Sequence, residues 1–137
     1  MNLTQLASRY KGVQTKLKYI SSDGCLFLCL CSIIEEITGQ PADIINIVQE
    51  SMAKKWLDNE FTVLDSLALL REFTGKTFRR LEVKKLPDVI KDNEFSIEVW
   101  QMPGSKGKHF KRRFVDTLID SQTVKYGNII EYYIYSY

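Results

Sequence analysis

The sequence predicts an α+β protein in which N-terminal helices pack on a C-terminal, largely antiparallel sheet. Two observations lead to this fold class. Up to Gly75, apolar residues recur with the spacing of helix faces, whereas from Thr77 onward they alternate in short segments rich in β-branched and aromatic residues. Helices that precede all the strands favour separate layers over alternating βαβ units. The 137 residues fit a single domain, 1–137, around one core.

The central element is a helix that we expect over Asp23–Gly39, because this stretch is apolar on nearly every face. Ser22 or Asp23 is predicted to cap its first turn, and the four residues Ser21–Gly24 are all turn formers that would lead into it. Gly39 suits the left-handed position that closes a helix. The expected helix is therefore long and buried almost all round.

The other helices follow from capping residues and apolar spacing. Residues 1–20 are predicted to contain a short amphipathic helix. Pro41–Lys54 is predicted to form a second helix, with the proline at or just before its start. Thr62–Gly75 is predicted to form a third, in which Thr62 and Asp65 resemble a capping box.

Period-two patterns and strand propensity predict the sheet. Tyrosine and isoleucine dominate the last of the four segments, and a short helical turn is expected at 86–91 between the first two. The predicted strands are 77–83, 95–100 and 128–137, and 109–119 is predicted to form a strand or a hairpin.

Composition excludes several classes of protein. No stretch reaches the ~20 apolar residues of a membrane span, so we expect no membrane association. The first residues lack a charged segment followed by an apolar one, and we expect a cytoplasmic location. The net charge of +2 does not by itself indicate a nucleic-acid binder.

The cysteines do not form a disulfide framework or a metal site. Cys25, Cys29 and Cys31 are an odd number within one helix, where their bridging geometry is poor. Structural zinc sites need two separated ligand pairs, and the chain offers one histidine. We therefore expect reduced thiols, no bound metal and no cofactor.

Cys25 differs from the other two cysteines in its place along the helix. In the predicted helix it falls in the first turn, where free amides and the helix dipole favour a thiolate. Free cysteines are more commonly small core residues, and that is our interpretation of Cys29 and Cys31. For Cys25 both interpretations stay open, and a nucleophile is one of them.

The residues that a thiol nucleophile needs follow later in the chain. His109, the single histidine, comes after a glycine-containing loop, and Asp120 lies beyond the next extended segment. A thiol requires a base that takes its proton and a carboxylate or amide that orients the base. Alone, such a histidine is usually solvated, and such an aspartate usually belongs to a turn.

Three motifs in this order resemble the papain-like cysteine peptidase superfamily: Asp23-Gly24-Cys25 at a helix start, Gly107-Lys108-His109-Phe110, and Ile119-Asp120-Ser121. The most similar branch is the compact bacterial one related to bacteriocin-leader peptidases. The chain also resembles small uncharacterised proteins carried by bacterial phages and plasmids.

The resemblance implies a papain-like fold and a peptidase or amidase with a peptide or protein substrate. It gives Cys25 the role of nucleophile, His109 that of base and Asp120 that of the residue orienting the base. Some members of the superfamily keep the scaffold and lose the reaction, so an inactive protein is also an expected outcome.

One departure from the family concerns the oxyanion hole. The family commonly carries a glutamine shortly before the cysteine, and Tyr19 occupies that place here. Ser21 and Ser22 are the hydroxyl candidates for a replacement. Loss of one oxyanion donor typically lowers turnover by about a hundredfold to a thousandfold.

The alternative is a non-enzymatic interaction protein that binds nucleic acid or protein through a basic segment. This segment carries five cations with two interleaved phenylalanines, a composition suited to phosphates and bases. A solvated edge strand explains it too, and we favour that explanation. The oligomeric state stays open. The five cations are Lys106, Lys108, Lys111, Arg112 and Arg113.

Overall fold

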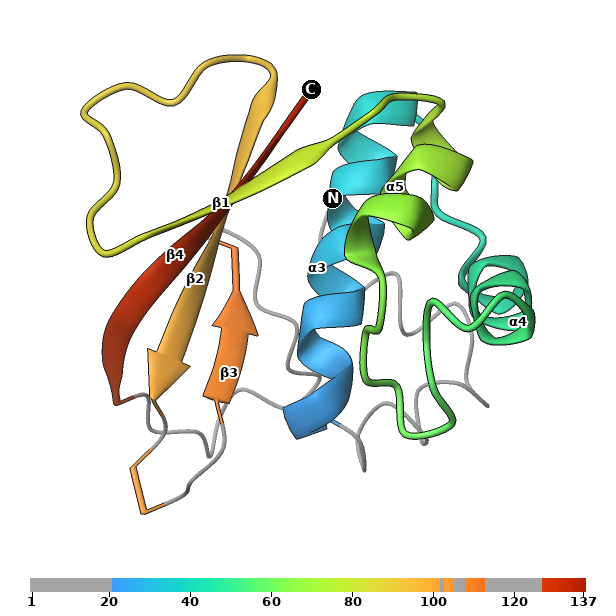
Figure 1. Ribbon diagram of the computed structural model, residues 1–137, viewed down its shortest axis with the longest axis horizontal. Helices are drawn as coiled ribbons and strands as arrows, with labels where there is room; N and C mark the ends of the chain where they lie inside the picture. The colour runs from blue at the N-terminus through green and yellow to red at the C-terminus, as the bar shows by residue number, and fades with distance from the viewer. Residues whose placement is uncertain (1–20, 102, 105–107, 113–126) are drawn as a thin grey trace.

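The computed structural model describes residues 21–101, 103–104, 108–112 and 127–137. Within these ranges the chain folds into three helices and one four-stranded antiparallel sheet, which confirms the α+β class (Figure 1). The helix expected within residues 1–20 lies outside the described ranges. No helix in the described part is both long enough and apolar enough to cross a membrane.

The central helix is α3, Ser21–Thr38, which lies between the sheet and the other two helices (Figure 1). Phe27, Leu30 and Ile33 are fully buried, as expected for a helix with neighbours on both sides. Its end is the predicted one: Gly39 adopts a φ of 68°, and its amide donates to the Glu35 carbonyl at 2.8 Å.

The beginning of α3 differs from the prediction. Ser21–Gly24, expected to be a turn, is helical. Aspartate is stabilising in the first turn of a helix as well as at its cap, because its negative charge interacts favourably with the helix dipole. The sequence therefore located this helix correctly but not its first residue.

The two shorter helices begin at aspartate caps. In α4, Ile44–Ala53, the Asp43 carboxylate accepts a hydrogen bond from the Asn46 amide, so the helix begins three residues after Pro41. In α5, Ser66–Thr74, the cap is Asp65, which accepts the Ala68 amide at 3.0 Å. The predicted capping box at Thr62 is wrong, because the residues before Asp65 are not helical.

The sheet has the order β1-β4-β2-β3, and every neighbouring pair is antiparallel. The last strand of the chain is thus inserted between the first two. No helical turn forms over 86–91. The strands are β1 (Arg79–Val83), β2 (Glu94–Gln101), β3 (Lys108–Lys111) and β4 (Asn128–Ser136).

The core lies between the sheet and α3. Alternate residues of β2, namely Phe95, Ile97 and Val99, are buried, and this is the period that places one face of a strand against a helix layer. On β4, the buried Tyr135 hydroxyl donates to Ser66 Oγ at the start of α5, at 3.0 Å. The sheet is therefore tied to α5 as well as packed on α3.

Candidate functional site

Cys25 lies near the start of α3 and is 1% exposed. It is the fifth residue of the helix, so its amide can bond to the carbonyl of Ser21 as in any regular helix. The expectation that Cys25 sits in the first turn is therefore wrong. The effect of the dipole falls off within that turn, so it acts less strongly on this sulfur than predicted.

The sulfur of Cys25 contacts β3. The backbone amide of Phe110 donates to Cys25 Sγ at 3.4 Å, across 85 positions of sequence. A strand amide points along the plane of the sheet, so the thiol lies beside an edge of β3 rather than over one of its faces. The opposite edge of β3 pairs with β2. The N-terminal part of α3 thus covers an edge of the sheet.

His109 directly precedes the amide that contacts Cys25. It is 3% exposed and lies opposite Trp100 in the pairing of β2 with β3. The structure therefore brings the predicted nucleophile to the stretch of chain that carries the predicted base. Asp120 and Tyr19 lie outside the described residues. Ser21 and Ser22 are the first two residues of α3.

The other two cysteines are core residues, as predicted. Cys29 and Cys31 are fully buried within the hydrophobic cluster around α3. Burial, and secondarily the nearby carboxylate of Glu35, raise the pKa of the Cys31 thiol far above its ordinary value. Cys31 therefore stays a neutral thiol in the folded protein.

Arg112 fastens the end of β3 to α3, a contact that the sequence did not reveal. Its guanidinium donates to Ser32 Oγ at 2.8 Å and to the Glu36 carboxylate at 2.6 Å, and it lies 5.7 Å from the Phe95 ring. The Arg112 side chain is only 15% exposed. Three hydrogen bonds, one from Phe110 and two from Arg112, therefore hold the strand that carries His109.

These contacts also change the interpretation of the basic segment. Arg112 is bound to α3, and Lys108 Nζ lies 3.8 Å from a carboxylate oxygen of Glu131. Lys111 is half-buried. Lys106 and Arg113 lie outside the described residues. In the part that the structure describes, the segment is engaged with the protein itself.

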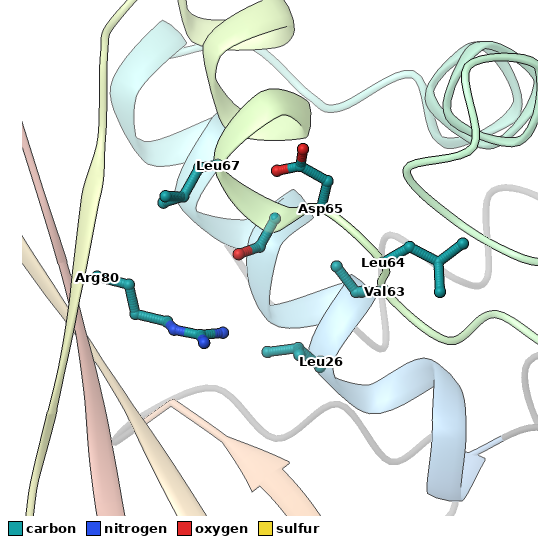
Figure 2. Close-up of a pocket in the computed structure, with 7 residues that line it drawn as sticks. Leu26, Val63, Leu64, Asp65, Leu67 and Arg80 are labelled. Atoms are coloured by element: carbon teal, nitrogen blue, oxygen red, sulfur yellow. The ribbon is translucent and has the colours of Figure 1, made fainter.

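A pocket of about 310 Å³ lies next to Leu26, the residue that follows Cys25 in α3 (Figure 2). Arg80 of β1 extends toward Leu26 across it. The Arg80 guanidinium also lies 4.9 Å from the Tyr133 ring and pairs with Glu82 at 3.2 Å. The lining residues are Leu26, Val63, Leu64, Asp65, Ser66, Leu67 and Arg80.

Among the described residues, no group of three or more histidines, cysteines and carboxylates is placed to hold a metal ion. Comparison of the chain with protein-family models, curated proteins and solved structures finds no match. The contact between Cys25 and the strand of His109 is therefore the main basis for a function.

Proposed function

We propose that the protein is a papain-like cysteine peptidase or amidase in which Cys25 is the nucleophile and His109 the base. One observation supports this most: the amide next to His109 donates to Cys25 Sγ at 3.4 Å. The strand that carries the single histidine of the chain thus lies against a helix-borne thiol 84 positions away from that histidine. Asp120 is the proposed orienting carboxylate, from the resemblance of its motif.

The chemistry is acyl transfer through a thioester. His109 takes the proton of the Cys25 thiol, and the sulfur attacks the carbonyl carbon of an amide. The C–N bond then breaks, and the imidazolium gives its proton to the departing amine. Water, deprotonated by the neutral imidazole, hydrolyses the thioester, which releases the acid and restores the thiol.

The contacts on β3 suit this role in two ways. A hydrogen-bond donor aimed at sulfur favours the anion over the thiol, and the amide of Phe110 is such a donor. Arg112 is anchored on α3, so it holds β3 at a fixed place relative to the helix that carries the nucleophile. Catalytic groups act best when their supports are rigid.

Turnover in this proposal is slow. The amide of Cys25 has an acceptor within α3, so it is not a free oxyanion donor as it would be in the first turn. The hydroxyls of Ser21 and Ser22, or Tyr19, are the remaining candidates. With one donor missing, turnover falls by about a hundredfold to a thousandfold. Trapping the thiol is therefore a better assay than product release.

The competing nucleic-acid function receives no support from the described cations. Arg112 and Lys108 each lie close to an acidic group of the protein, which reduces their availability to phosphates. We therefore propose only the thiol hydrolase.

The test is covalent trapping with a small peptidyl vinyl sulfone, followed by mass spectrometry that assigns the modified residue. We expect one adduct at Cys25, none in Cys25→Ala, and a rate about a hundredfold lower in His109→Ala because the base is lost. Lys108→Ala, next to His109 on the same strand, is the matched control and should react at the parental rate. Equal rates in His109→Ala and the parent, or no adduct at Cys25, would contradict the proposal.

A further inference from the structure

The two edges of the sheet are not equivalent. The edge at β3 is covered by α3 through the contacts of Phe110 and Arg112. The other terminal strand, β1, pairs with β4 on one side, and no described strand lies on its second side. An open strand edge presents free amides and carbonyls that can pair with another chain.

The side chains of β1 are also accessible. Leu81, at the centre of the strand, is 59% exposed, and the residues Arg79–Glu82 are all exposed. Arg80 and Glu82 flank Leu81 and lie on the same face of the strand, where they form an ion pair at 3.2 Å. This edge, which is open in the part of the chain that the structure describes, therefore combines one apolar residue with two opposite charges at symmetric positions.

We propose that β1 pairs in antiparallel fashion with β1 of a second copy of this chain, with Leu81 on the two-fold axis. In this register Leu81 lies opposite its own equivalent, and Arg80 lies opposite Glu82 of the second copy. The two-fold axis generates the same contact a second time, so two pairs between an arginine and a glutamate form across the interface. A homodimer needs a self-complementary surface, and the order Arg80-Leu81-Glu82 is one.

The charge pattern selects this partner. An unrelated strand would bring charges of any sign to Arg80 and Glu82, and like charges directly opposite one another are destabilising. Strand pairing adds main-chain hydrogen bonds, and the exposed Leu81 side chains become buried against each other. Since β1 has only five residues, the interface is small and the dimer exchanges with monomer.

The test is sedimentation equilibrium of the full chain over a range of concentrations, with three variants. We expect a reversible dimer whose association weakens about tenfold in Glu82→Arg, because both symmetric pairs become repulsive. The double swap Arg80→Glu with Glu82→Arg restores complementarity and should associate within about twofold of the parent. Glu72→Arg makes the same charge change on α5 and should leave association unchanged.

Folding is checked separately by thermal melting monitored by circular dichroism, because Arg80 also contacts Tyr133. Leu81→Lys is a second variant that disrupts the proposed interface. Because Leu81 is exposed in the monomer, this substitution should have little effect on folding, and it should weaken association as strongly as Glu82→Arg. A protein that stays monomeric at every concentration would overturn the proposal. So would a dimer that is insensitive to both Glu82→Arg and Leu81→Lys.

Discussion

The two edge strands of the sheet meet very different surroundings. At β3, an amide donates to the Cys25 sulfur, and a partly buried arginine directly after the strand bonds to two residues of α3. At β1, the charged side chains are exposed and pair mainly with each other. Both strands are short and basic in sequence, so composition does not separate them.

This difference shows how position in the sheet decides the role of similar residues. Arg112 on the covered edge is 15% exposed and supports the candidate site. Arg79 on the open edge donates to Ser136 Oγ at 3.2 Å and remains exposed. Arg112 makes two hydrogen bonds to another element, whereas Arg79 makes one, and each such bond typically contributes about 1 kcal/mol. The covered edge is therefore the one on which we expect substitutions to matter most.

The largest effect is expected for Arg112→Ala. The substitution removes both bonds to α3, and we expect the free energy of unfolding to fall by about 2 kcal/mol, less than a fully buried pair because Glu36 is largely exposed. Urea denaturation at low protein concentration measures it. Arg112→Lys keeps the charge but cannot donate to both partners as the guanidinium does, so its free energy of unfolding should fall by about half as much. No change in either variant would show that β3 is not held through Arg112.

A smaller effect concerns Cys31 and pH. Its pKa is raised in the folded state, so the unfolded thiol loses its proton first as pH rises above about 9, and stability falls from there upward. Between pH 8 and pH 10 we expect this to remove about 1 kcal/mol. Cys31→Ala should have a lower stability at pH 8 but a correspondingly flatter dependence on pH. Equal slopes in the two proteins would contradict the assignment.

The smallest effect is expected for Arg79→Ala, the counterpart of Arg112→Ala on the open edge. Arg79 makes one part-buried hydrogen bond where Arg112 makes two, so the free energy of unfolding should change by no more than about 1 kcal/mol in the same urea titration. If Arg79→Ala cost as much as Arg112→Ala, the contrast between the two edges would be wrong.

The sequence predicted the elements better than their arrangement. Gly39 and Gly75, both left-handed, ended their helices as expected, because glycine is the residue best suited to that conformation. The starts were less certain, since Ser22, Asp23, Thr62 and Asp65 can all act either as caps or as flanking residues. Local capping chemistry alone does not choose among them.

The strand order could not be predicted. The insertion of β4 between β1 and β2 depends on pairing over long sequence distances, for which a single sequence carries no direct signal. The near-continuous apolar and aromatic run of β4 is consistent with a central strand, but it would fit an edge strand against an interface as well.

The candidate site was predicted only in part. The motifs around Cys25 and His109 indicated that the two belong together, and the contact at Phe110 is consistent with this. The role of Arg112 was missed, because its partners Ser32 and Glu36 lie 80 and 76 positions away and nothing local marks them. The basic segment instead suggested a surface for nucleic acid.

The most direct test of the central claim is the pH dependence of iodoacetamide alkylation at Cys25, measured residue by residue in the parent and in His109→Ala. At pH 6.5 an ordinary thiol reacts at about 1% of its plateau rate. We expect Cys25 to keep at least about half of its plateau rate there, to lose this in His109→Ala, and to react while Cys29 and Cys31, which are buried to the same degree, do not. If Cys25 has the same profile in both proteins, or is as unreactive as Cys31, it is a third core cysteine and the thiol hydrolase is wrong.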